Sequence, residues 1–168
     1  MKAKTIKESS LSMSHLMTPQ DANLAGNVHG GVIMKLIDDA AGTVAARHST
    51  GNAVTASIDR LSFFSPVFIG NLLTLRASIN HAGKTSMEIG VRVEAEDIFT
   101  GAVRHTASAY LTFVALDENL KPKEIPGIIL ENDNEKRRNR EAIERRQNRL
   151  KERSKEESCQ KDPVKCEL

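Results

Sequence analysis

The sequence predicts an α+β fold in which one long antiparallel sheet wraps around a single central helix, followed by a charged C-terminal helix or tail. Two observations predict the folded part. Only residues 30–48 read as a strong helix, and this segment is apolar on nearly every side, as is typical of a helix buried in protein. The later segments alternate apolar and polar residues, which is typical of antiparallel strands with one buried face.

The elements follow one another in the order β-α-β-β-β-β. Residues 11–16 are expected to form a short first strand, and Gly51-Asn52 ends the helix in a turn. Four longer strands are then expected, over residues 53–64, 72–80, 86–96 and 103–116. Because strands of ten or more residues exceed the usual length, we expect a long twisted sheet that encloses the helix in its concave face.

The composition changes sharply near Leu130. Residues 1–130 are expected to form one domain, and residues 131–168 a charged tail that is helical at first and disordered from Ser154. In the helical part, acidic and basic residues interleave at helical spacing and only Ile143 and Leu150 are available to bury, which favours a solvent-exposed helix. Cys159 and Cys166 close the chain and could pair, although nothing requires it.

Length and charge bound the possible functions. A chain of 168 residues is long enough for one globular domain with a real core. A net charge of only +2 gives no reason to expect general attraction to nucleic acid or membrane. The sequence has no apolar run of transmembrane length, no secretory signal and no His/Cys metal cluster. These features predict a cytoplasmic protein without a metal.

Two adjacent acids, Asp38 and Asp39, interrupt the apolar helix. At 100° per residue, Asp39 lies one turn after Lys35, so an exposed ion pair is expected there. Asp38 has no such partner on its own helix. Because an unpaired buried carboxylate is costly, Asp38 must find a partner elsewhere or have its pKa raised. The residues alone leave open whether Asp38 holds loop amides for assembly or carries chemistry.

A longer pattern surrounds these acids. Residues 21–48, D-A-N-L-A-G-N-V-H-G-G-V-I-M-K-L-I-D-D-A-A-G-T-V-A-A-R-H, and residues 52–70, N-A-V-T-A-S-I-D-R-L-S-F-F-S-P-V-F-I-G, closely resemble the hotdog-fold acyl-CoA thioesterases. The resemblance is closest to the cytosolic acyl-CoA hydrolase group. It continues through G-K-T-S-M-E-I-G-V-R-V-E-A-E and A-S-A-Y-L-T-F-V-A-L, and so covers nearly all of residues 11–130.

The resemblance implies a hotdog fold and an enzyme that hydrolyses acyl-CoA to a free fatty acid and coenzyme A. In that family the active site forms between two hotdog units, from an acid on the central helix and an Asn just before the helix of the partner unit. By motif position these are Asp38 and Asn27. The expected partner is thus a second copy of the chain, in a homodimer that assembles further into a trimer of dimers. No cofactor is expected, since CoA is part of the substrate and product.

The chemistry that the resemblance implies places Asp38 as general base, or as a nucleophile that forms a transient anhydride. The first N–H groups of the helix, of Gly30 or Gly31, are candidate oxyanion-hole donors, because they have no internal partner and lie at the positive end of the helix dipole. Simpler roles stay open: the glycines could merely make a tight entry into the helix, and Asn27 could cap it. His29 could help hold the thioester or serve the turn.

Other residues could hold the CoA part of the substrate. Lys84, Thr85 and Ser86 resemble the segment that contacts CoA in relatives, although an ordinary polar hairpin would look the same. Thr55 and Ser57 lie on the strand along which relatives run the pantetheine arm. Arg60 and the Arg137-Arg138 pair are further phosphate candidates. Four residues could line an acyl tunnel or simply belong to the core: Met34, Phe63, Phe64 and Phe68.

Three other functions are alternatives to hydrolysis. A hotdog dehydratase would need a catalytic His segment, which is not visible. A non-catalytic acyl-CoA sensor is the main alternative, but binding alone needs neither Asp38 nor Asn27. The tail could form an arm that binds nucleic acid or protein, but its interleaved acids would cancel most attraction to phosphate.

Overall fold

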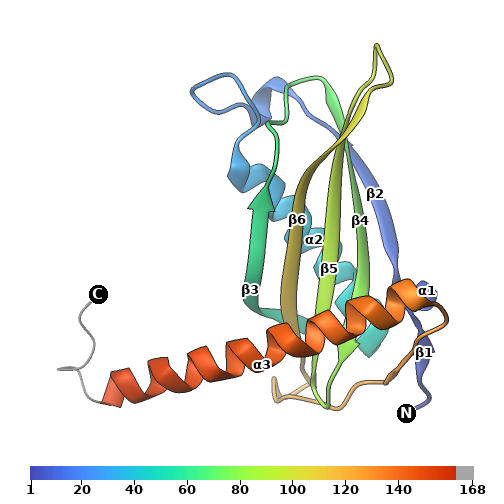
Figure 1. Ribbon diagram of the computed structural model, residues 1–168, viewed down its shortest axis with the longest axis vertical. Helices are drawn as coiled ribbons and strands as arrows, with labels where there is room; N and C mark the ends of the chain where they lie inside the picture. Colours follow the sequence, from blue (N-terminus) through green and yellow to red (C-terminus); the bar gives the residue numbers. More distant parts are fainter. Residues whose placement is uncertain (162–168) are drawn as a thin grey trace.

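The computed structural model describes residues 1–161, with side chains described as far as residue 158. Its elements follow in this order: β1 (Lys4–Thr5), α1 (Ile6–Ser9), β2 (Leu11–Leu16), the 3-10 helix η1 (Pro19–Asp21), α2 (Gly30–Ser49), β3 (Ala53–Phe63), β4 (Asn71–Ala82), β5 (Ser86–Asp97), β6 (Val103–Ala115), β7 (Ile128–Ile129) and α3 (Asp133–Lys161). Figure 1 shows α3 lying across the face of the sheet that is turned away from α2.

The main sheet has five antiparallel strands in the order β2-β4-β5-β6-β3, which confirms the predicted strands and their bounds to within a few residues. β3 and β2 are therefore its two edges. A small parallel pair of β1 and β7 and the single-turn helix α1 were not predicted. Elements of two to four residues are too short to show a hydrophobic period.

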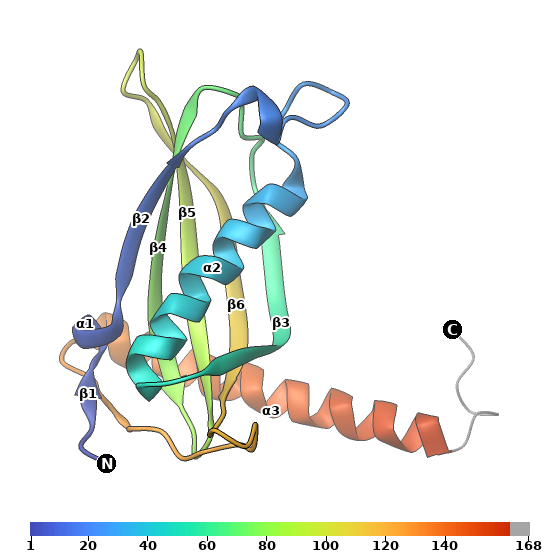
Figure 2. The same cartoon turned by 180° about the vertical axis from the view of Figure 1, so that it is seen from behind.

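Helix α2 runs along the concave face of the sheet and packs on its strands (Figure 2). Ile33, Ile37 and Val44 are buried there against inward-facing residues of the sheet such as Leu75 and Phe113. The prediction that α2 is buried nearly all round is wrong for this chain, because its far side is exposed. That side carries Gly31, Met34, Lys35, Asp38 and Asp39. Gly31 and Met34 on this side extend the apolar pattern of the helix, so the sequence did not show the exposed stripe.

Helix α3 differs from the prediction in two ways. It continues to Lys161, so disorder from Ser154 is wrong for residues 154–161. Its first half is also not simply solvated, because Ala142 is fully buried and α3 packs on the outer face of the sheet near β4. A pairing of Cys159 with Cys166 falls outside the described side chains.

The C-terminal end of α2 holds a buried histidine. His48 is fully buried, and its Nε2–H donates to the Pro126 carbonyl oxygen at 2.8 Å. Its Nδ1 atom is buried without a hydrogen-bond partner among the described residues. Burial lowers the pKa of His48 below 6.5, more than the bond to Pro126 and nearby Glu8 raise it, and Lys4 lowers it further.

This histidine makes the free energy of unfolding depend on pH. Below about pH 6.5 the unfolded chain binds a proton on His48 that the folded chain does not bind. Lowering the pH therefore lowers the free energy of unfolding, by at most about 1.4 kcal/mol per pH unit. Burial lowers the pKa of His81 as well, and so adds to the slope. The free energy of unfolding, measured by urea denaturation between pH 7.5 and 5.5, should therefore change less with pH in His48→Gln than in the wild type. Glutamine keeps an Nε2 donor for the Pro126 carbonyl. An unchanged slope would contradict this account.

Candidate active site

Asp38 finds its partner on the neighbouring edge strand. Its Oδ1 accepts a hydrogen bond of 2.7 Å from the hydroxyl of Thr55 on β3. Asp39 behaves as predicted, with its carboxylate 2.9 Å from Lys35 Nζ in an exposed pair. The carboxylate of Asp38 itself is exposed on the uncovered side of α2. A single chain therefore presents a carboxylate that is held in place and open to a ligand.

His29 caps the N-terminus of α2, whereas the sequence analysis gave Asn27 as the possible cap and expected His29 to hold the thioester or serve the turn. Its Nδ1 accepts a hydrogen bond of 2.8 Å from the N–H of Gly31. The Gly31 N–H is therefore engaged within the chain. By contrast, the N–H of Gly30 has no acceptor among the described residues. Of the two predicted oxyanion donors, Gly30 is the one that remains available.

Asn27 sits in a tightly connected loop ahead of α2. Its backbone N–H donates to Asn23 Oδ1 at 3.2 Å, and the next residue, Val28, donates to the Val67 carbonyl at 2.9 Å. The side-chain amide of Asn27 has no hydrogen-bond partner within residues 1–161. It borders a cavity of about 370 Å³ that Gly30 and two aromatic residues, Phe63 and Phe64, also line.

One chain does not bring Asn27 and Gly30 together with Asp38. Asp38 follows Gly30 by eight residues, which is about 12 Å along a helix. A thioester carbonyl has to lie about 3 Å from both its oxyanion donor and the attacking group. Asp38 and the Gly30 N–H of the same chain are therefore too far apart to act on one carbonyl.

The predicted CoA-contacting turn lies at the other end of the sheet. Asn27 forms an isolated β-bridge with Phe68, which lies just before β4 begins. Lys84 to Ser86 follow the other end of β4 (Figure 1). Lys84 Nζ is 3.3 Å from a carboxylate oxygen of Glu124, and both side chains are well exposed. Nothing in the chain's own contacts tests whether this turn binds CoA, so that role stays a prediction.

Thr55 and Ser57 do not share a face, although both were predicted to contact the pantetheine arm. In the ladder with β6, Thr55 pairs with Phe113 and Ser57 pairs with Thr112, so Ala56 is an extra residue in a bulge. The bulge turns Ser57 to the outer side of the sheet, where its hydroxyl donates to Asp59 Oδ1 at 2.7 Å. The period-two pattern of the sequence could not show this change of face.

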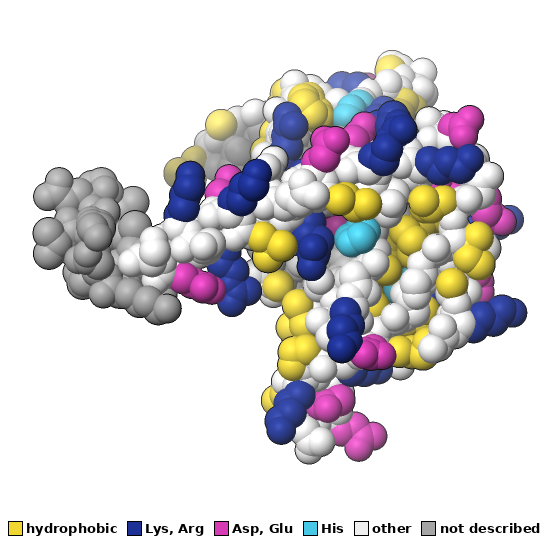
Figure 3. Space-filling model, turned by 60° about the horizontal axis from the view of Figure 1, so that its bottom comes forward, with side chains coloured by type: hydrophobic (Ala, Val, Ile, Leu, Met, Phe, Trp, Pro, Cys, Tyr) yellow, Lys and Arg dark blue, Asp and Glu magenta, His cyan; other side chains and the backbone are white. Residues whose placement is uncertain are grey.

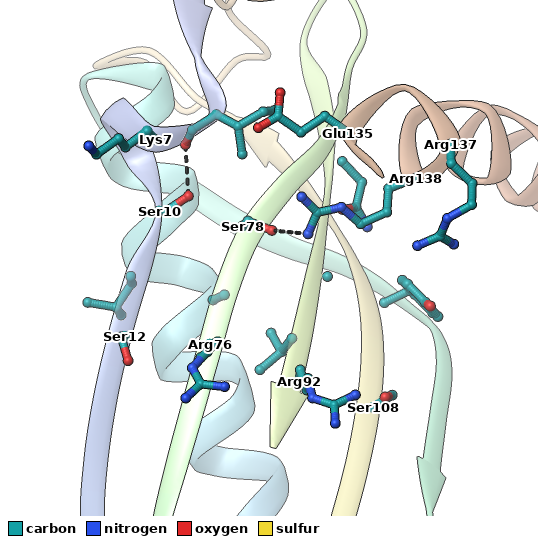
Figure 4. Close-up of a pocket in the computed structure, with 17 residues that line it drawn as sticks. Lys7, Ser10, Ser12, Arg76, Ser78, Arg92, Ser108, Glu135, Arg137 and Arg138 are labelled. Atoms are coloured by element: carbon teal, nitrogen blue, oxygen red, sulfur yellow. Dashed lines mark hydrogen bonds between the residues drawn. The ribbon is translucent and has the colours of Figure 1, made fainter. Parts of the chain in front are cut away.

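A second cavity, of about 750 Å³, lies on the outer face of the sheet near the start of α3 (Figure 4). Arg138 donates to Ser78 Oγ at 3.2 Å beside it. The bond from Arg92, with the charge of Arg76, lowers the pKa of Glu94. Basic and acidic side chains are mixed over the face shown in Figure 3. This cavity is lined by Arg137 and Arg138 but by none of the predicted catalytic residues.

The part of the chain that the structure describes offers neither a metal centre nor a membrane span. None of its groups of His, Cys, Asp and Glu side chains could together hold a metal ion. None of its helices is both long enough and apolar enough to cross a membrane.

A long helix that lies in the concave face of a five-stranded antiparallel sheet defines the hotdog class of folds, which confirms the predicted fold. The model of the thioesterase superfamily matches residues 25–102. The chain belongs to this superfamily, because it also covers 97% of a hexameric acyl-CoA thioesterase of known structure with 36% identity. That structure superposes on 90% of this chain with a TM-score of 0.87.

Two more relatives also have names of acyl-CoA hydrolases. The mouse cytosolic acyl coenzyme A thioester hydrolase is 40% identical over 136 residues, which are 80% of this chain but only 36% of the mouse protein. An acyl-CoA hydrolase from Staphylococcus aureus, solved with butyryl coenzyme A and coenzyme A, is 34% identical, with a TM-score of 0.89 over 97% of this chain and 99% of that one. It has also been solved with alanine replacing an aspartate, an asparagine or a threonine.

Proposed function

We propose that this chain is an acyl-CoA thioester hydrolase whose active site is built from two copies of the chain. The observation that carries the proposal is the split of the catalytic groups. Asp38, held by Thr55, lies exposed on an uncovered helix face. The free N–H of Gly30 lies about 12 Å from Asp38 along the helix, toward its N-terminus, and Asn27 lies in the loop before the helix. The names of the relatives support the reaction, and an aspartate and a threonine, the residue types of Asp38 and Thr55, are among the residues replaced in the Staphylococcus enzyme.

In the proposed mechanism, Asp38 takes a proton from a water molecule as that water attacks the thioester carbonyl carbon. The Gly30 N–H of the partner copy stabilises the oxyanion that forms, and Asn27 beside it orients the water or the carbonyl. Collapse of the tetrahedral intermediate breaks the C–S bond, and the CoA sulfur leaves as a thiolate that takes up a proton. In the competing route Asp38 attacks the carbonyl itself, and water then hydrolyses the mixed anhydride.

The surface of the single chain supports the dimer. Among the described strands β3 pairs only with β6, so its other edge is open. Exposed apolar side chains cluster on β3 and α2, among them Met34, Ile58 and Phe63. Open edges and apolar patches of this kind are normally covered by a partner. A second copy would cover them and complete two equivalent sites. The hexameric relative supports further assembly into a trimer of dimers.

The rest of the substrate is assigned by proposal as well. Lys84, Thr85 and Ser86 are proposed to contact the phosphates and the pantetheine arm of CoA. Ser57 is left out of this proposal, because its hydroxyl is engaged with Asp59 on the outer face. We further propose that the reaction uses no cofactor, and that it takes place in the cytoplasm, as the name of the mouse relative suggests for that protein.

The proposal is tested by measuring free CoA released from short-, medium- and long-chain acyl-CoAs. Chromatography is preferable to a thiol dye, because Cys159 and Cys166 would react with the dye. Turnover is expected, and the chain-length profile then defines the substrate class. Binding of acyl-CoA without release of CoA would overturn the proposal in favour of a non-catalytic acyl-CoA sensor.

A further inference from the structure

We propose that the C-terminal helix α3 positions the active site through an ion pair between Arg149 and Asp59. This inference rests on the proposed function, because it assigns α3 a role in holding the strand that carries Thr55. Arg149 and Asp59 are positioning residues, since neither contacts Asp38. The superfamily model matches residues 25–102 only, so α3 lies outside the segment that defines the family.

Strand β3 is irregular where it meets Asp38. Its ladder with β6 shifts register twice, between Thr55 and Ser57 and between Ile58 and Arg60. Its other edge has no partner among the described strands. A bulged edge strand is held by fewer backbone bonds than a central strand, so its local geometry depends on side-chain contacts. Thr55, which holds Asp38, directly precedes the first bulge.

Asp59 fixes both bulges from the outer side. Its side chain is only 7% exposed, and both of its carboxylate oxygens are engaged. Oδ1 accepts from Ser57 at 2.7 Å, and Oδ2 accepts from Thr112 at 2.9 Å and from Arg149. A nearly buried carboxylate needs a compensating charge, and Arg149 is its ion-pair partner. Without Arg149, the carboxylate would turn toward water and release Ser57.

The position of Arg149 follows from how α3 crosses the sheet. Arg138 bonds to Ser78 on β4, Arg145 to Glu88 on β5, and Arg149 to Asp59 on β3. Arg149 follows Arg138 by eleven positions, which is about 16 Å of helix. The three strand spacings from β4 to β3 span about 14 Å. One stripe of the helix therefore reaches from one side of the sheet to its edge strand.

Together these contacts form a continuous chain from α3 to the catalytic carboxylate. Arg149 holds Asp59, Asp59 holds Ser57, and Ser57 fixes the outer side of the bulge whose inner neighbour is Thr55. The Thr55 hydroxyl then holds Asp38. A helix that reads as a solvated tail thus supports the strand on which the orientation of Asp38 depends.

The test compares Arg149→Gln with Arg145→Gln in the full-length chain. Both variants remove an arginine from the same stripe of α3 and leave a nearly buried acid, but Glu88, the partner of Arg145, lies two strands away from β3. Hydrogen exchange followed by mass spectrometry should show faster exchange over residues 53–60 in Arg149→Gln only. Its kcat for CoA release should fall about tenfold with KM little changed, and Arg149→Lys, which keeps the charge, should recover most of it.

A double-mutant cycle shows whether the effect passes through Thr55. Arg149→Gln should cause no further loss of kcat when Thr55→Ala is already present. The proposal would be overturned if the kcat losses of Arg149→Gln and Thr55→Ala multiply in the double variant. Equal effects of the two arginine variants on kcat, or unchanged exchange over residues 53–60, would overturn it as well. If the wild type releases no CoA, the proposed function fails. The hydrogen-exchange measurement does not depend on turnover. Faster exchange over residues 53–60 in Arg149→Gln alone would still show that Arg149 fixes β3, and unchanged exchange would show that it does not.

Discussion

The Asp38→Asn variant is expected to release CoA at least about a hundredfold more slowly than the wild type. The amide can neither accept a proton from water nor attack the thioester, so both proposed routes lose their reacting group. It can still accept the hydrogen bond from Thr55, and the side chain is exposed, so folding should be little affected. The measurement is kcat by chromatography of released CoA, beside urea denaturation of the same preparation.

Asp39→Asn is the matched control, because it makes the same change one residue away. It removes only an exposed ion pair with Lys35, of a kind worth about 0.3–0.5 kcal/mol. Its kcat should equal that of the wild type. An Asp38→Asn enzyme that keeps most of its activity, or an equal loss in both variants, would remove Asp38 from the mechanism.

The largest expected effect on stability comes from the charged tail. Arg145→Gln should lower the free energy of unfolding by about 3–5 kcal/mol, because it leaves a buried carboxylate without its counter-ion. The side chain of Glu88 is 3% exposed, and Arg145 bonds to both of its oxygens, at 3.1 and 2.8 Å. The guanidinium of Arg145 also lies 3.8 Å from the centre of the Tyr110 ring, a contact that the variant loses.

Arg137→Gln serves as the comparison on the same helix. Arg137 pairs with Glu141 one turn away, and both side chains are substantially exposed, so the loss should stay below about 0.5 kcal/mol. Urea denaturation of the two full-length variants measures the difference. If both lose equally little, α3 does not pack on the sheet in solution, and the domain ends near Leu130 as the sequence analysis predicts.

The strands could be predicted because one face of the sheet carries apolar residues and the other face carries polar ones. In residues 86–96 the apolar positions Met87, Ile89 and Val91 are buried in the structure, as their alternation indicates. The exposed side of α2 could not be read in the same way. Its exposed stripe includes Gly31 and Met34 beside the charged residues, and such residues fit both a core and an interface that a single chain leaves open.

The docking of α3 could not be predicted from the tail alone. Interleaved arginines and glutamates have the same pattern whether they face water or a surface of opposite charge. The signal lay elsewhere, in acids such as Glu88 and Asp59 on the outer side of strands, with Arg145 and Arg149 spaced one turn apart on the tail. That correspondence becomes visible only once the topology places the strands side by side.

The residues of the candidate site stay a prediction, and the sequence did not show all the contacts that they make. Asp38 and Asn27 came from the resemblance and Gly30 from the free N–H groups of a helix N-terminus, whereas the bond between Thr55 and Asp38 joins residues 17 positions apart, and the outward turn of Ser57 depends on a bulge. A bulge has no local signature when its extra residue is as ordinary as Ala56. The engagement of the Gly31 N–H by His29 was likewise missed, because histidine is not among the usual capping residues.

The central claim, that each site takes Asp38 from one chain and Asn27 from another, is tested most directly by subunit complementation. Asn27→Ala and Asp38→Asn chains, each nearly inactive alone, are unfolded together in equal amounts and refolded. Random pairing makes half of the dimers hybrids, and each hybrid has one intact site out of two, so about a quarter of wild-type activity should return. A mixture no more active than its separate components would contradict the shared site and place both residues in a site within one chain.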